Sequence, residues 1–420
     1  MSQIFSGIQP SGELHIGNYL GAVKNWVQLQ AQHADAIFCV VDYHAMTGNY
    51  DPAVLRQRRR DMAVSLLAAG IDPARATTGR VAALPRRFYL ARMTRIFSGI
   101  QPSGELHIGN YLGAVKNWVQ LQTQHPGAIF CIVDYHALTG TYEPQALRKR
   151  TYDMAVSLLA AGIDPAHATL YVQSAVPEHT ELAWIFNTIT PVGELERQTQ
   201  YKDKASRQES VLAGILNYPV LQAADILLYK ADAVPVGEDQ VQHLELSREI
   251  ARKWNARFAP EGAPYFPEPK ALLTPTRRIM GLDGQAKMSK SMGNTIGMLD
   301  SPEVIWAKLR PAVTDPARIR KTDPGTPEIC NIYHLHKAFS DVATVEHVAV
   351  QCRTAGWGCI DCKKVLAESM EQELVPIRTR AEALRENPSL VEDALAQGAS
   401  RCRAIARETM REVRARMGFD

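Results

Sequence analysis

The chain has 420 residues, of which 46% are hydrophobic and 22% charged, a composition typical of a globular protein with two or three domains. Its formal net charge of +3 is too small to indicate nucleic-acid binding by itself. The sequence has no uncharged apolar run of about 18 residues, so we expect no membrane span. Seven cysteines without an export signal favour a reducing, cytoplasmic location.

The first feature along the chain is a repeat. The segment IFSGIQPSGELHIGNYLGAVKNWVQLQ occurs at 4–30 and again at 96–122. With each position n aligned to n+92, the match continues without a gap through 77, with 61 identities in 74 positions. The Arg-rich stretch that follows the first copy lacks periodicity and predicts a linker. We therefore expect residues 1–92 to be a truncated duplicate with a linker, and a complete unit to begin at Met93.

From Met93 onward, apolar runs alternate with helical patterns. We predict strands at 95–100, 128–138 and 168–176, and helices at 111–122, 143–162 and 177–189. This alternation indicates right-handed βαβ crossovers and a parallel, Rossmann-type sheet, so the expected fold class is α/β. Helical patterns dominate beyond about Asp300, which predicts a Rossmann domain at 93–298 and a helical domain at 299–420.

Two short motifs contain residues suited to binding a nucleotide. HIGN (107–110) lies between the first strand and helix, where glycine lets the backbone approach a phosphate or adenine and the helix N-terminus favours negative charge. KMSKS (287–291) follows the flexible segment GLDGQA and offers two lysines and two serines to a polyphosphate. Taken singly, the first could be a structural turn and the second a solvated surface loop. Their order in one chain makes a nucleotide site the better interpretation.

The pair of motifs resembles the signature of class I aminoacyl-tRNA synthetases. From Met93 to its end the chain also resembles bacterial tryptophanyl-tRNA synthetases, in the stretches VDYHALT, GELERQTQYKDK, YPVLQAADILLY and VPVGEDQVQHLELSREIA. The resemblance implies a Rossmann catalytic domain (93–298) and a helical domain (299–420) that binds the tRNA anticodon. It also implies a homodimer that uses ATP with Mg²⁺ to convert L-tryptophan to its adenylate and then charges tRNA(Trp).

The same resemblance implies roles for individual residues. The catalytic set would be His107, Asn110, Lys287 and Lys290. ATP would be held by Gln101, Pro102, Ser103, Gly109, Asn110, Gly237, Glu238, Asp239, Ile279, Lys287, Met288, Ser289, Lys290 and Ser291. Tryptophan would be held by Phe97, Gly99, His136, Tyr218, Gln222, Asp225, Val234, Val236 and Gln240. Asp225 would accept the indole N–H, a hydrogen bond that a phenylalanine-like competitor cannot make.

Gln222 departs from the tryptophanyl pattern, which has Met at this position. The arrangement Tyr-x-x-x-Gln-x-x-Asp is similar to that of tyrosyl enzymes, so a tyrosyl-tRNA synthetase is one alternative, although VPVGEDQ and GELERQTQ favour tryptophan. A non-catalytic tRNA-binding paralogue is a second alternative, against which the intact motifs argue. A third is another nucleotidyltransferase of the same superfamily, against which the cysteine-bearing helical domain argues.

Four cysteines in the helical domain form a possible metal site. Cys330, Cys352, Cys359 and Cys362 follow the spacing C-x21-C-x6-C-x2-C. Four thiolates suit either zinc or a [4Fe–4S] cluster, and the spacing does not choose between them. The pattern resembles that of tryptophanyl enzymes that carry an iron–sulfur cluster, and this resemblance favours [4Fe–4S] over zinc.

Overall fold

The structure is a computed structural model that describes residues 5–12, 14–33, 36–47, 50–72, 94–199, 201–202, 211–237, 240–260, 264–273 and 279–419. Most of the predicted linker, at 78–93, lies outside these residues, as does the side chain of Ser291. No helix of the described part is long and apolar enough to cross a membrane.

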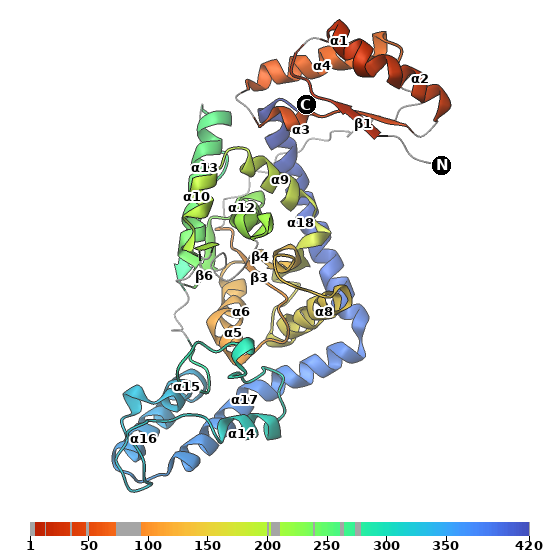
Figure 1. Ribbon diagram of the computed structural model, residues 1–420. Coiled ribbons are helices and arrows are strands. Elements are labelled where there is room, and N and C mark those ends of the chain that lie inside the picture. The colour runs from red at the N-terminus through yellow and green to blue at the C-terminus, as the bar shows by residue number, and fades with distance from the viewer. Residues whose placement is uncertain are drawn as a thin grey trace.

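Parallel strands form the centre of the molecule (Figure 1). They are β3 (Phe97–Ile100), β4 (Ala128–Ile132), β5 (Ala168–Val172), β6 (Ala233–Val236) and β7 (Lys270–Leu273). β3, β4 and β5 form one parallel ladder, and β6 and β7 form another. A parallel bridge from Ile96 to Ala233 joins the two, which gives the spatial order β5-β4-β3-β6-β7. This is the strand order of a doubly wound fold, and it confirms the predicted Rossmann-type α/β class.

The sheet is covered by the helices that connect its strands. These are α5 (Ile108–Asn110), the π-helical turn Tyr111–Val115, α6 (Lys116–Gln124), α7 (Asp134–Ala137), α8 (Pro144–Ala161), α9 (Glu178–Asn187), α10 (Val192–Glu196), α12 (Ala213–Leu228) and α13 (Val241–Phe258). Trp118 of α6 stacks on Phe130 of β4 with ring centroids 4.8 Å apart, and both side chains are buried. This contact fixes the first crossover against the sheet.

Two of the predicted strands are too long at their carboxyl ends. The predicted strand 128–138 ends at Ile132, and Asp134 begins helix α7. The predicted strand 168–176 ends at Val172 and continues as the 3₁₀ turn Gln173–Ala175. The Asp134 carboxylate accepts the Ser174 backbone N–H at 2.9 Å, so the two chain segments turn together at this edge of the sheet. Apolar runs alone do not reveal where such a turn begins.

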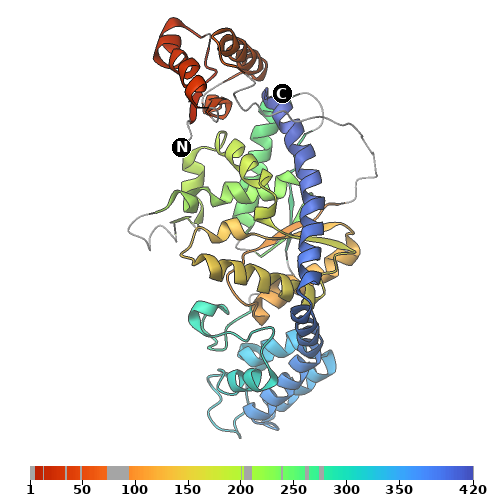
Figure 2. The same cartoon turned by 90° about the vertical axis from the view of Figure 1, so that its right-hand side faces the viewer.

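Helices follow the sheet in the C-terminal third. They are α14 (Pro302–Leu309), α15 (Asn331–Phe339), α16 (Val342–Arg353), α17 (Cys359–Glu386) and α18 (Pro388–Met417). Figure 2 shows α18 leaving this helical group and running back along the sheet. A Cβ added at Gly398 would lie 1.9 Å from the carbonyl oxygen of Leu170, so only glycine allows α18 to approach β5 this closely.

The duplicate folds as a small unit at one end of the molecule (Figure 1). It contains β1 (Phe5–Ile8), α1 (Ile16–Asn18), the π-helical turn Tyr19–Val23, α2 (Lys24–Gln32), β2 (Ile37–Val40), α3 (Asp42–Ala45) and α4 (Pro52–Ala68). β1 and β2 pair in parallel, as β3 and β4 do. Among the described residues β2 has no second partner strand, whereas β4 also pairs with β5.

The duplicate is packed against the end of α18. Met46 and Leu55 are 1% and 3% exposed and belong to the apolar core that includes Phe419. Arg56 Nη2 donates to the backbone carbonyl of Ala415 at 2.8 Å, and Arg59 Nη1 donates to that of Gly418 at 3.3 Å. These arginines add side-chain donors to carbonyl groups at the C-terminal end of α18.

The two copies offer a matched test of how context sets stability. Val156 in α8 is 0% exposed and Val64 in α4 is 65% exposed, although the residues around them are identical. We expect Val156→Ala to lower the free energy of unfolding by about 2 kcal/mol, because a buried valine is lost. Val64→Ala should change it by less than about 0.5 kcal/mol, because alanine is also the better helix former.

Urea unfolding of both variants, followed by circular dichroism, measures the two changes. Equal losses in the two variants would show that the exposed and buried copies are not energetically distinct.

Candidate active site

The HIGN loop connects β3 to α5 and is held by its own side chains. The Nδ1 atom of His107 accepts the backbone N–H of Asn110 at 3.3 Å, and Asn110 Oδ1 accepts the backbone N–H of His107 at 3.3 Å. This reciprocal pair caps the first helical turn. A Cβ at Gly109 would lie 2.9 Å from His107 Nδ1, so glycine is required for the histidine to fold over the turn.

The KMSKS loop lies directly against the HIGN loop. The backbone N–H of Ile108 donates to the carbonyl of Ile296 at 2.9 Å, and the N–H of Met298 donates to the carbonyl of Leu106 at 2.8 Å. Lys290 Nζ is 3.1 Å from where a Cβ of Gly104 would be, and Gly104 has a φ of +124° that favours glycine. The HIGN motif at 107–110 and the KMSKS motif at 287–291 are far apart in the sequence, but they line the same region of the structure.

The electrostatics of this space keep His107 neutral. Burial, followed by the positive charges of Lys290 and Lys287, lowers the pKa of His107 to about 4. Because Nδ1 accepts a hydrogen bond, the proton of the neutral ring resides on Nε2, which can donate. Burial also lowers the pKa of Lys290. The arrangement gathers hydrogen-bond donors and positive charge, which is what a polyphosphate requires.

Asn294 organises the KMSKS loop and was not singled out from the sequence. Its Oδ1 accepts the backbone N–H of Ser289 at 2.8 Å, and its Nδ2 donates to Asp283 Oδ2 at 2.9 Å. A Cβ at Gly281 would lie 1.9 Å from Asn294 Nδ2, so the side chain fills the space that this glycine leaves. Gly293, just before it, was the available sequence signal of a tight turn, and the structure gives this glycine a φ of +64°.

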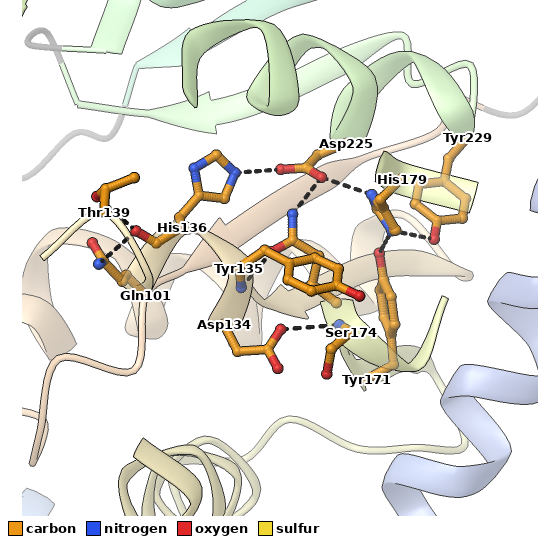
Figure 3. A network of polar contacts seen from close by, with 11 residues as sticks. Gln101, Asp134, Tyr135, His136, Thr139, Tyr171, Ser174, His179, Asp225 and Tyr229 are labelled. Carbon is orange, nitrogen blue, oxygen red and sulfur yellow. Dashed lines mark hydrogen bonds and ion pairs between the residues drawn. The ribbon is translucent and has the colours of Figure 1, made fainter. Parts of the chain in front are cut away.

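A buried carboxylate on helix α12 lies between two histidines (Figure 3). Asp225 of α12 is 1% exposed. Its Oδ2 is 2.8 Å from His136 Nε2, and its Oδ1 accepts from Gln173 Nε2 at 2.6 Å and contacts His179 Nδ1 at 2.6 Å. Burial by itself raises the pKa of Asp225, but hydrogen bonds from the two histidines outweigh it, so the pKa lies well below the usual value. The site therefore holds an ionised carboxylate away from water.

Other residues of the predicted amino-acid pocket surround this carboxylate. Tyr218 lies edge-on to His136 with ring centroids 6.3 Å apart, and its hydroxyl is 3.0 Å from His243 Nε2. Gln101 Nε2 donates to the backbone carbonyl of His136 at 3.2 Å, which links the nucleotide loop to the carboxylate site. Three further buried residues of this region, Gln173, His179 and His243, were not predicted from the sequence.

The remaining predicted residues are placed as follows. Phe97, Val234 and Val236 are buried strand residues, and Phe97 stacks on Tyr229 at 5.6 Å. Gly99, Gln222, Gly237, Gln240 and Ile279 are partly exposed or exposed, Pro102 and Met288 are buried, and Ser103 is exposed. Glu238 and Asp239 lie outside the described residues.

The four cysteines of the helical group line one cavity. Cys330 precedes α15, Cys352 is on α16, and Cys359 and Cys362 begin α17. The cavity has an empty volume of about 370 Å³, part of it open to solvent. Within the described part of the chain, however, no three His, Cys, Asp or Glu side chains are grouped closely enough to hold a metal ion. The thiols share a cavity without forming a closed set of ligands, and their chemistry suits a soft metal centre.

The duplicate repeats only the first part of the site, which includes the counterpart of the HIGN loop. His15 caps its turn through Nδ1, which accepts the N–H groups of Gly17 at 3.1 Å and Asn18 at 3.3 Å. Ile16 is 70% exposed, whereas the equivalent Ile108 is 0% exposed. The difference arises because the segments that cover Ile108 come from the chain beyond the repeated region.

Comparison with known proteins shows which family this chain resembles. The sequence profile described as tRNA synthetases class I (W and Y) matches residues 1–85 and 90–375. The tryptophan–tRNA ligase of Deinococcus radiodurans is 57% identical over 331 residues, which cover 78% of this chain and 99% of the relative. That of Thermotoga maritima is 44% identical over 331 residues, with 77% and 99% covered. The tryptophanyl-tRNA synthetase of Campylobacter jejuni, solved with ADP and tryptophan, has a TM-score of 0.70 at 37% identity and covers 77% of this chain and 99% of that one.

The Rossmann sheet, with HIGN and KMSKS loops at its edge, has the fold of a class I aminoacyl-tRNA synthetase. Within that class, the chain belongs to the family of tRNA synthetases class I (W and Y).

Proposed function

We propose that the chain is a tryptophan–tRNA ligase. It activates L-tryptophan with ATP and then transfers the amino acid to tRNA(Trp). The observation that carries this proposal is the buried, ionised Asp225, held by three donors beside a site rich in positive charge. A carboxylate at this depth needs a further hydrogen-bond donor, which a phenylalanine-like side chain lacks and which the indole N–H of tryptophan supplies.

We assign the two regions of the site separate roles. ATP lies along the HIGN and KMSKS loops, with Gln101, His107 and Lys290 among its contacts. Glu238 and Asp239, which lie outside the described residues, are proposed to meet its ribose and adenine. Tryptophan lies between β3, β6 and α12, with its indole N–H on Asp225. The hydrogen bond from Gln101 to His136 supports this division, because an uncharged amide connects the positively charged nucleotide region to the carboxylate region.

The reaction requires no protein nucleophile. A carboxylate oxygen of tryptophan attacks the α-phosphorus of ATP, and the bond from that phosphorus to the bridging oxygen breaks as pyrophosphate leaves with the electron pair. Lys287, Lys290 and the Nε2–H of His107 stabilise the charge that develops on the phosphate oxygens. Mg²⁺ that accompanies ATP supplies further positive charge. A tRNA hydroxyl then attacks the carbonyl carbon of the adenylate and loses its proton, and the bond from that carbon to the phosphate oxygen breaks as AMP leaves.

We further propose the roles of the other regions. Residues 299–420 bind the tRNA anticodon, the active form is a homodimer, and the protein acts in the cytoplasm. Residues 1–92 add no second site, because the duplicate has neither a KMSKS loop nor a counterpart of Asp225.

The four cysteines are proposed to ligate a [4Fe–4S] cluster, with zinc less favoured. Support comes from the cavity that all four line and from the softness of thiolate ligands. We place the cluster beside the anticodon-binding region as a bound group, and no step of the activation reaction depends on it.

Tryptophan-dependent exchange of pyrophosphate into ATP tests the proposed function. We expect exchange with tryptophan and none with tyrosine. Lys290→Ala should lower kcat for exchange by about a hundredfold while the KM for tryptophan changes by less than about threefold, because the lysine acts on the phosphates. Exchange with tyrosine alone would favour the tyrosyl alternative, and no exchange with any amino acid would contradict the synthetase assignment.

Metal analysis tests the cysteine site. Protein purified without oxygen should carry about four iron atoms per chain and absorb broadly in visible light. Cys362→Ser should lose the iron, because one thiolate ligand is removed. The control Cys39→Ser, in the duplicate, should keep it. One zinc per chain, or equal iron loss in both variants, would contradict the cluster.

A further inference from the structure

A second histidine, His179, contacts the carboxylate of Asp225, which in the proposed function accepts the indole N–H of tryptophan. His179 of α9 is 0% exposed. Its Nδ1 is 2.6 Å from Asp225 Oδ1, and its Nε2 is 2.8 Å from the Tyr171 hydroxyl and 2.9 Å from the Tyr229 hydroxyl. Figure 3 shows the imidazole between the carboxylate and the two phenols, on the side of Asp225 away from His136. It belongs to none of the predicted residue sets, and its side-chain hydrogen bonds among the described residues go to Asp225, Tyr171 and Tyr229.

The protons of this network can be placed from its chemistry. The ionised carboxylate of Asp225 only accepts hydrogen bonds, so His179 Nδ1 must carry a proton. Burial raises the pKa of both Tyr171 and Tyr229 far above the usual value, so both hydroxyls keep their protons. In a neutral imidazole, Nε2 then accepts a hydrogen bond from one of the two hydroxyls. The two tyrosines thereby fix both the tautomer and the orientation of the ring.

Counting acceptor positions shows what this arrangement leaves open. A carboxylate offers about four lone-pair positions. Among the described residues, Gln173 and His179 contact Oδ1 and His136 contacts Oδ2. Oδ1 is therefore saturated, and the remaining acceptor position belongs to Oδ2, on the side of His136. His136 is the member of the set with some exposure, 12% of its side chain, so this position is the one that a ligand can reach.

We propose that His179 is a positioning residue for amino-acid selection, which orients the Asp225 carboxylate so that one Oδ2 acceptor position is left for the indole N–H. This inference rests on the proposed function, because it takes tryptophan as the substrate. Without the donor at Nδ1, Oδ1 loses one of its two anchors and the carboxylate is free to rotate about its Cβ–Cγ bond. The acceptor then no longer points reliably at the indole, and the preference for an N–H donor weakens.

Two substitutions separate this role from a general packing role. His179→Asn keeps an N–H donor near the position of Nδ1, whereas His179→Gln places its amide near the position of Nε2. We expect the asparagine variant to hold Asp225 and the glutamine variant to release it. Both replacements leave a buried polar side chain in the same cavity, so each is a control for the other.

The readout is the preference for tryptophan over β-(3-benzothienyl)alanine, in which sulfur replaces the indole N–H. Both amino acids are tested in pyrophosphate exchange on the same full-length preparations, so the amount of folded enzyme cancels in the ratio. We expect His179→Gln to reduce the ratio of kcat/KM values by about tenfold, through a higher KM for tryptophan alone. His179→Asn should keep the ratio within about threefold of the wild type, and the KM for ATP should not change in either variant.

The outcomes distinguish the inference from the proposed function. A wild-type protein that shows no tryptophan-dependent exchange overturns both. A wild type that exchanges normally, with the same ratio in His179→Gln, overturns only the role of His179. Equal losses for tryptophan and its sulfur analogue also overturn it, because a packing defect alone acts on both.

Discussion

Two backbone hydrogen bonds bring the catalytic site together. They run from Ile108 to Ile296 and from Met298 to Leu106, and they join the loop after the first strand to the segment after the KMSKS loop. Because these hydrogen bonds join backbone atoms, they fix the position of one loop relative to the other whatever side chains lie nearby. Lys290 is thereby held over Gly104, and burial together with the charges of Lys290 and Lys287 lowers the pKa of His107. A repeated segment without the later loop cannot reproduce this arrangement, and the exposed Ile16 of the duplicate shows the result.

The two halves of the site meet opposite electrostatic demands. The HIGN and KMSKS loops concentrate positive charge and N–H donors, whereas the predicted amino-acid pocket holds a buried carboxylate that hydrogen bonds from His136 and His179 keep ionised. This separation matters for the role that we propose for Asp225, because a lysine beside the carboxylate would satisfy it and weaken its need for an indole N–H. The hydrogen bond from Gln101 to the backbone of His136 connects the two regions through an uncharged group.

Much of the fold followed from patterns in the sequence, because apolar runs and helical periodicity are local properties. The Rossmann sheet, the loops at its edge and the family are confirmed. The strand predicted over 128–138 is wrong beyond Ile132, since the turn at Asp134 is set by a contact with Ser174. His179 was missed because its contacts to Asp225 and Tyr229 join residues far apart in the sequence. Asn294 was missed although Gly293 beside it indicated a turn, because the sequence does not show that its side chain bonds Ser289 and Asp283. The individual site residues remain predictions, as does the metal at the four cysteines.

One chain with two copies of the HIGN segment still has one complete site, and this is the central claim. It is tested most directly by comparing tryptophan-dependent pyrophosphate exchange in His107→Ala and His15→Ala, two variants of the full chain altered at equivalent positions. Our account predicts that His107→Ala lowers kcat by about a hundredfold and that His15→Ala leaves it unchanged. A comparable loss in His15→Ala would contradict it, because the duplicate would then take part in the chemistry.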